Sequence, residues 1–173
     1  MISYLGEDTF FDFLNTLTSD IKKEGDLQHA QKLIVSEYTK EAIAAIQEAD
    51  KQAIPILAVV DGYQALVEAY GGKCEPLPTN SDGLQEWCVI DATSPLYLDL
   101  ESVVKVCRAK PVALCEECRP ELLDVMSRAE TGEVLAVRKL VGKEYQNVFA
   151  VNFHLDSPLT VDGKQMVENF LKL

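Results

Sequence analysis

The sequence predicts one three-layer α/β domain over residues 1–173, with a mostly parallel central sheet flanked by helices. Short apolar runs alternate along the chain with segments of helical periodicity, as they do in α/β proteins. Residues 54–60 form a continuous apolar run, which is typical of a strand covered on both faces. The composition, 47% hydrophobic and 25% charged, is that of an ordinary globular protein.

Each element is predicted from its own apolar pattern and its boundary residues. Apolar residues spaced three and four apart mark one face of each expected helix, and Asp8 or Thr9 is the expected cap of the first. Gly71 and Gly72 end the third helix. Helices are expected at 8–17, 39–52, 61–70 and 163–171. Strands are expected at 2–5, 33–35, 54–60, 87–90, 103–107, 112–115, 133–140 and 147–153, and a helical turn or a loop is expected at 120–125.

The charge balance and the terminal sequence exclude several classes of partner. The formal net charge is −12, so the chain is poorly suited to a phosphate backbone and no nucleic-acid partner is expected. The N-terminus lacks the basic start of a signal peptide, and no apolar run approaches the roughly 20 residues of a membrane helix. We therefore expect a cytoplasmic protein without a membrane partner.

The cysteines, at positions 74, 88, 107, 115 and 118, are odd in number and suggest reduced thiols. Cys115 and Cys118 form a lone CxxC pair. A zinc site needs four ligands, usually from two such pairs or from added histidines, so we expect no metal and no cofactor. Two ordinary thiols at a strand end are the plain interpretation, and a redox dithiol is the alternative.

The most informative segment, residues 54–64, reads IPILAVVDGYQ. A buried strand, a sharp turn with glycine and a helix form the arrangement of a nucleophile elbow, which lifts one side chain above the carboxyl edge of the sheet. The segment resembles the elbow of the class I glutamine amidotransferases, proline-x-leucine-glycine-isoleucine-cysteine-x-glycine-x-glutamine, with matches at Pro55, Leu57, Gly62 and Gln64. This resemblance implies the flavodoxin-like fold of that family.

A second resemblance to the same family lies near the C-terminus. Residues 150–157 read AVNFHLDS, which is similar to glycine-valine-glutamine-phenylalanine-histidine-proline-glutamate-serine. Thr160, Gly163 and residues 169–171 match the closing pattern of threonine, glycine and asparagine-phenylalanine-leucine. This tail most resembles the glutaminase subunits of anthranilate and aminodeoxychorismate synthases.

The resemblance implies roles for three positions. In the family, the elbow cysteine attacks the glutamine amide, a histidine acts as its base, and a glutamate orients the histidine. His154 matches the histidine and Asp156 matches the glutamate. The cysteine position is filled by Val60, which has no nucleophile, so glutaminase activity is not expected. Residues 33–42 also lack the glycines that supply an oxyanion-hole amide in the family.

Valine at this position also predicts a change of geometry. An elbow residue is usually strained, at a cost of about 1–3 kcal/mol, and a β-branched side chain tolerates the strain badly. We therefore expect the turn at Val60 to be relaxed. A shift of one residue would make Asp61 an elbow nucleophile, but the register of Gly62 and Gln64 favours Asp61 as a cap of the following helix.

These observations support a catalytically degenerate amidotransferase-like protein, either a structural or regulatory subunit or a ligand-binding protein. The family implies a synthase-type protein partner, and the vestigial pocket at Asp61, Gly62 and Gln64 implies a small amide or amino-acid ligand. His154 and Asp156 are interpreted as a structural remnant, with a binding role as the alternative. The second hypothesis is a hydrolase or transferase that uses His154, Asp156 and another nucleophile in the same cleft. The third hypothesis is that the chain resembles the family purely by ancestry.

Overall fold

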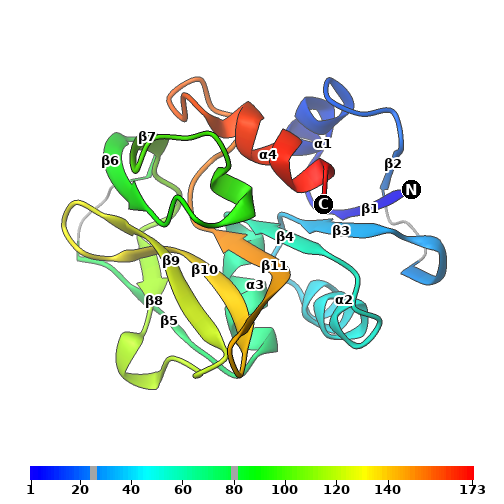
Figure 1. Cartoon of the computed structure of the whole chain (residues 1–173), viewed down its shortest axis with the longest axis horizontal. Coiled ribbons are helices and arrows are strands. Elements are labelled where there is room, and N and C mark those ends of the chain that lie inside the picture. The colour runs from blue at the N-terminus through cyan, green and yellow to red at the C-terminus, as the bar shows by residue number, and fades with distance from the viewer. Residues whose placement is uncertain (24–26, 79–81) are drawn as a thin grey trace.

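The computed structural model describes residues 1–23, 27–78 and 82–173. Within them lie a nine-stranded sheet of order β2-β1-β3-β4-β11-β10-β9-β6-β7 and a separate pair of β5 with β8 (Figure 1). The strands are β1 (Ile2–Leu5), β2 (Ile21–Lys23), β3 (Lys32–Val35), β4 (Ile56–Val59), β5 (Cys74–Pro76), β6 (Gln85–Ile90), β7 (Val103–Cys107), β8 (Val112–Leu114), β9 (Leu123–Ala129), β10 (Val134–Val141) and β11 (Glu144–Val151). The α-helices are α1 (Asp8–Asn15), α2 (Lys40–Lys51), α3 (Asp61–Ala69) and α4 (Gly163–Leu171), and the 3₁₀ helices are η1 (Leu27–His29), η2 (Pro95–Tyr97) and η3 (Glu116–Cys118).

The centre of the large sheet is parallel. β2, β1, β3, β4 and β11 pair in parallel, whereas β10, β9, β6 and β7 extend the sheet in antiparallel fashion from β11. Parallel strands end at one edge, so the segments after β1, β3, β4 and β11 meet there, where α/β proteins usually bind their ligands. The predicted α/β fold with a parallel central sheet flanked by helices is confirmed.

Alternating side chains of β4 divide the core into two layers. Leu57 and Val59 belong to a cluster with the apolar faces of α1 and α4, whereas Ile56 and Ala58 belong to a cluster with α2 and α3. Figure 1 shows α1 and α4 together on one side of the sheet and α2 on the other. All four residues of β4 are buried, which explains its continuous apolar sequence.

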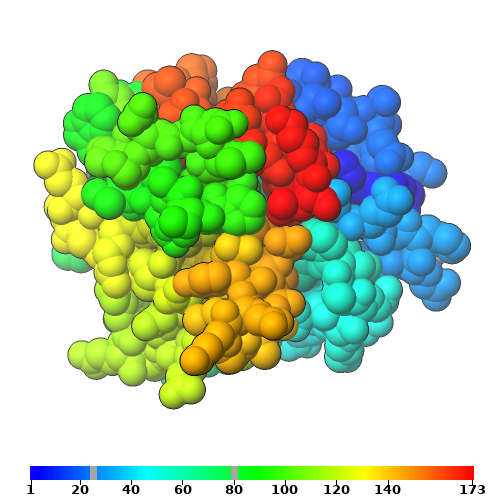
Figure 2. All heavy atoms as spheres, viewed as in Figure 1, coloured from blue at the N-terminus to red at the C-terminus, as the bar shows by residue number. Residues whose placement is uncertain are grey.

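The C-terminal helix α4 is locked against the segment around η2. The side-chain amide of Asn169 donates hydrogen bonds to the carbonyl oxygens of Leu96 and Leu98, at 3.1 and 2.9 Å. In Figure 2, α4 (red) fills the space between this segment (green) and the N-terminal region (blue). The contact fixes α4 beside η2.

Several boundaries follow the sequence closely. Thr39 caps α2, because its Oγ1 accepts a hydrogen bond from the backbone N–H of Ala42 at 3.0 Å. The closing helix spans Gly163–Leu171, as predicted. The expected cap of α1 was wrong: Glu7 is the N-cap, without a side-chain cap hydrogen bond, and Asp8 is already helical.

The prediction of a helical turn or a loop at 120–125 was wrong for residues 123–125. Leu123–Ala129 forms strand β9, which pairs antiparallel with β10 and β6. The two partners come from other parts of the chain, so the segment gains its strand from non-local pairing rather than from its own pattern. The short strands β2 and β5, of three residues each, were not predicted.

Candidate functional site

The turn between β4 and α3 has retained its strain, so the prediction of a relaxed turn was wrong. Val60 adopts φ 56° and ψ −108°, a backbone conformation that a β-branched residue rarely adopts. Its N–H donates to the carbonyl of Val151 at 2.9 Å, and its own carbonyl accepts from the N–H of Tyr63 at 3.0 Å. Neighbouring strand and helix therefore hold this conformation against the preference of the side chain.

Gly62 provides the physical reason for the retained turn. A Cβ atom built on Gly62 would lie 2.1 Å from the carbonyl oxygen of Val35, at the end of β3. The start of α3 can approach β3 this closely only because Gly62 has no side chain. This approach sets the path of the chain at the turn, whatever side chain stands at position 60.

Asp61 is the first residue of α3 and pairs with Lys110, which follows β7. Lys110 Nζ lies 2.8 Å from each carboxylate oxygen of Asp61. A carboxylate in the first turn is favourable at the positive end of the helix dipole. The N-cap of α3 is Val60, without a side-chain cap hydrogen bond, so the expectation that Asp61 caps the helix was wrong. The strained residue is Val60, and the register is therefore not shifted onto Asp61.

His154 and Asp156 follow β11 and make different contacts. His154 Nε2 lies 3.6 Å from Asp82 Oδ1, and its ring is 33% exposed. The backbone N–H of His154 donates to the carbonyl of Cys107 at 2.9 Å, and its carbonyl accepts from Thr160 Oγ1 at 2.5 Å. Within the described residues, no hydrogen bond joins His154 to Asp156.

Ser36 is the first residue after β3, and its backbone N–H is already used in a hydrogen bond. Ser36 N–H donates to the carbonyl of Leu5 at 2.8 Å. Its hydroxyl lies 2.5 Å from the hydroxyl of Tyr4, which also donates to the carbonyl of Glu7 at 2.8 Å. Burial is the largest cause that raises the pKa of Tyr4 well above its usual range, and Asp156 is among the charges that add to it. This network is a neutral, hydrogen-bonded contact between the ends of β1 and β3.

Gln64 lies one turn into α3 and lines a cavity of about 370 Å³. The cavity is lined by Tyr38, Gln64, Glu68, Gly72, Lys73 and Cys74. Neither Val60 nor His154 lines it. Gln64 therefore borders a surface hollow that the other predicted site residues do not line.

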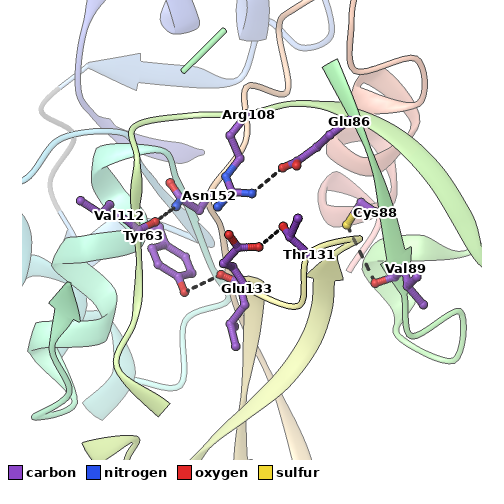
Figure 3. Close-up of polar contacts among 10 residues, drawn as sticks. Tyr63, Glu86, Cys88, Val89, Arg108, Val112, Thr131, Glu133 and Asn152 are labelled. Carbon is purple, nitrogen blue, oxygen red and sulfur yellow. Dashed lines mark hydrogen bonds and ion pairs between the residues drawn. The ribbon is translucent and has the colours of Figure 1, made fainter. Parts of the chain in front are cut away.

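Sequence reasoning missed a buried polar group beside the end of β11. Arg108 Nη1 donates to Glu86 Oε1 at 2.6 Å, and the Arg108 side chain is only 2% exposed (Figure 3). Asn152 Nδ2 donates to the carbonyl of Val112 at 2.6 Å. Nε and Nη2 of Arg108 and Oδ1 of Asn152 lack hydrogen-bond partners in the described part of the chain. The basic residue follows a strand in the sequence, but no local signal marks it as buried.

The CxxC pair lies beside the short 3₁₀ helix η3. Cys118 is exposed, and its thiol lies 3.7 Å from the carbonyl oxygen of Cys115. A hydrogen bond with Cys118 raises the pKa of the Cys115 thiol. In residues 1–23, 27–78 and 82–173, no group of three or more metal-ligating side chains occurs and the five cysteines are free. No helix in these ranges is long and apolar enough to cross a membrane.

The strand-turn-helix at Val60, the parallel sheet and the segment after β11 define a class of protein. The family "Glutamine amidotransferase class-I" matches residues 23–173. The chain belongs to the class I glutamine amidotransferases.

Curated relatives agree with this assignment. Anthranilate synthase component 2 of Cyanophora paradoxa is 27% identical over 118 residues, which cover 68% of this chain and 60% of that protein. Anthranilate synthase component 2 of Thermus thermophilus is 34% identical over 118 residues, which cover 68% and 56%. The glutamine-hydrolysing GMP synthase of Christiangramia forsetii is 33% identical over 119 residues, which cover 68% and 22%. The matched region therefore spans less than two thirds of each of these relatives.

Solved structures show the same fold. A protein from Thermoplasma acidophilum, described as a putative component of GMP synthase, superposes with a TM-score of 0.81 at 16% identity, covering 99% of this chain and 92% of that one. A glutamine amidotransferase from Thermotoga maritima gives a TM-score of 0.78 at 11% identity, with coverage of 99% and 96%.

Proposed function

We propose that this chain is a class I glutamine amidotransferase domain that does not hydrolyse glutamine, with Val60 in the position of the catalytic cysteine. The single observation that carries the proposal is the strained backbone of Val60 at the turn from β4 into α3. Backbone strain of this kind gathers at catalytic positions. An isopropyl group there can neither attack a carbonyl nor release a proton.

The surroundings of the turn support the same conclusion. Glutamine hydrolysis in a cysteine triad needs a base next to the nucleophile and amides that stabilise an oxyanion. Here His154 faces Asp82, and the Ser36 amide is occupied by Leu5. The ion pair between Asp61 and Lys110 lies directly beside Val60 in the chain. These contacts support the interpretation of His154 and Asp156 as a remnant of the triad, in which His154 does not act as a base.

A protein partner of the synthase type follows from the relatives. Two of them are named as component 2 of anthranilate synthase, so they are parts of a larger enzyme. A domain that has lost the nucleophile can retain the surface that binds a synthase, and we place it in the cytoplasm in a structural or regulatory role within such a complex. The hydrolase or transferase alternative has no supporting contact: in the described ranges, no thiol or hydroxyl side chain hydrogen-bonds to the His154 ring.

The test is reaction with a glutamine-mimicking electrophile such as 6-diazo-5-oxo-norleucine, followed by intact mass and by ammonia release from glutamine. Wild type is expected to form no adduct and to release no ammonia. Val60→Cys serves as the matched control, because it places a thiol on the strained residue and is expected to be alkylated. A wild-type adduct on Asp61, or on any residue of the turn, would contradict the proposal.

The partner is tested separately by affinity capture from the native cytosol and mass spectrometry. Near-stoichiometric recovery of a synthase-type protein is the expected result. Recovery of the chain alone would remove the subunit role and would leave a free-standing ligand binder.

A further inference from the structure

The CxxC pair belongs to the connection between β8 and β9, which takes no part in the turn at Val60. Cys115 is the residue before η3, and Cys118 is the last residue of η3. Side chains three positions apart in a 3₁₀ helix lie on the same side, because this helix has three residues per turn. Cys118 is exposed and Cys115 is half-buried, so a small molecule in solvent can reach the pair.

The two side chains of this pair are turned toward each other. Sγ of Cys118 lies 3.7 Å from the carbonyl oxygen of Cys115. A hydrogen bond between the two side chains raises the pKa of the Cys115 thiol. Cys115 is therefore the thiol that keeps its proton, and the exposed Cys118 is the thiol that a reagent meets first. A ring closed over so short a segment also costs little chain entropy.

The other cysteines are poorer sites for thiol oxidation. Cys88 and Cys107 are buried. Burial is the largest cause that raises the pKa of Cys74 to about 12 and that of Cys88 to about 11. The thiolate is the reactive form, so Cys74 and Cys88 react slowly near neutral pH. Cys115 and Cys118 combine access from solvent with a partner thiol, as a reversible disulfide requires.

The surroundings of Cys115 favour an uncharged reagent. Cys115 borders a hollow of about 260 Å³ whose lining includes the carboxylates of Glu75, Glu116 and Glu133. Glu116 is paired with the guanidinium of Arg128 at 2.7 Å, whereas Glu75 forms no ion pair with a described residue. The negative charge that remains repels an anion such as glutathione disulfide. A hydroperoxide is small and neutral, so it can approach the pair without this repulsion.

We propose that Cys115 and Cys118 form a reversible disulfide and that a hydroperoxide is the oxidant. The Cys118 thiolate attacks a peroxide oxygen, the O–O bond breaks, and Cys118 becomes a sulfenic acid. The other peroxide oxygen takes up the proton that Cys118 released and leaves as water or an alcohol. The Cys115 sulfur then attacks the Cys118 sulfur, the S–O bond breaks, and the hydroxyl group leaves as water with the Cys115 proton. The two thiols are thereby oxidised to a disulfide and the peroxide is reduced, and a dithiol reductant restores the thiols.

The experiment treats the full chain with a small molar excess of hydrogen peroxide in the presence of a metal chelator. Free thiols are then blocked with N-ethylmaleimide and the protein is digested. Trypsin does not cut before Pro111 or Pro120, so Cys115 and Cys118 are the two cysteines of one peptide, residues 109–128. This peptide should lose two hydrogen atoms and carry no N-ethylmaleimide, and dithiothreitol should reverse the change. Its oxidation should be about tenfold or more faster than that of Cys74, whose raised pKa leaves little thiolate.

Single variants separate the roles of the two thiols. Cys115→Ser removes the second thiol, so the sulfenic acid of Cys118 should accumulate and be trapped by dimedone. Cys118→Ser removes the attacking thiol, so Cys115 should stay reduced under the same treatment. Cys74→Ser is the matched control and should leave the disulfide unchanged. Glutathione disulfide should oxidise the wild-type pair slowly at low salt and faster at high salt, whereas the rate with hydrogen peroxide should not depend on salt.

Four results would contradict the proposal. The first is a peptide 109–128 that keeps both thiols while Cys74 is oxidised. The second is a disulfide that joins two chains in place of one between Cys115 and Cys118. The third is the absence of a dimedone adduct on Cys118 in Cys115→Ser. The fourth, which would overturn the choice of oxidant, is a rate with glutathione disulfide that does not rise with salt.

Discussion

Replacement of Glu86 by alanine should destabilise the protein, because Arg108 would lose the partner of its buried ion pair. Arg108 is 2% exposed and Glu86 is 23% exposed, and their contact is 2.6 Å. Two further donors of the guanidinium already lack partners in the described residues. Removing Glu86 therefore leaves the buried guanidinium without its hydrogen-bonded carboxylate, and only the more distant carboxylate of Glu133 remains nearby in the described part of the chain (Figure 3).

The magnitude follows from the burial of the two partners. Loss of one member of a buried ion pair costs about 3–5 kcal/mol. Because water can reach the Glu86 side, we expect a value near the lower end, about 3 kcal/mol. The matched control is Glu116→Ala, which removes the partner of Arg128 from an exposed pair with side chains 48% and 41% exposed. Its loss should cost only about 0–1 kcal/mol, since solvent screens such pairs.

The assay is urea denaturation followed by far-ultraviolet circular dichroism, which reports the whole chain rather than one position. Glu86→Ala should lower the free energy of unfolding well beyond Glu116→Ala. The double variant Arg108→Met with Glu86→Leu should recover most of the loss, because it leaves no charge buried. Equal losses in Glu86→Ala and Glu116→Ala would refute the reasoning.

Three further predictions concern the turn, a helix cap and a thiol. Gly62→Ala should cost about 3 kcal/mol in urea denaturation, because its Cβ would lie 2.1 Å from the carbonyl oxygen of Val35; a loss below that of an ordinary surface substitution would contradict this. Thr39→Ala should cost about 1 kcal/mol by the same assay, since it removes the hydrogen bond to the Ala42 N–H, and an unchanged midpoint would argue against the cap. Burial raises the pKa of Cys88 from 9.0 to about 11, so its stabilisation is complete below pH 9 and is lost as the pH rises to about 11. The temperature of thermal unfolding should therefore fall more steeply with pH in wild type than in Cys88→Ala, and parallel curves would contradict the assignment.

The elements that could be predicted are those whose signals are local. The strand β4 is continuous and apolar because both of its faces are buried, and the cap Thr39 acts on an amide three residues away. Strand β9 could not be predicted in this way. Its sequence LDVMSRA places charged residues among apolar ones, and it becomes a strand because β10 and β6 satisfy its backbone.

The candidate site was predictable only in part. The position of the turn could be predicted from the residues around Gly62. The pairing of Asp61 with Lys110 could not, because it joins residues 49 positions apart. The burial of Arg108 likewise depends on segments that are distant in the chain. The strain at Val60 was misjudged because the preference of one side chain was weighed without the packing of its neighbours.

The close approach of Gly62 to β3 has a consequence for how position 60 tolerates change. Neighbouring elements set the backbone conformation at position 60. The stability of a full set of variants at this position should therefore follow how readily each residue adopts a positive φ, rather than the chemistry of its side chain. Glycine and asparagine should stand above isoleucine and threonine in such a ranking. The packing of Gly62 against β3 sets the shape of the turn. The backbone should therefore keep this conformation whichever side chain stands at position 60.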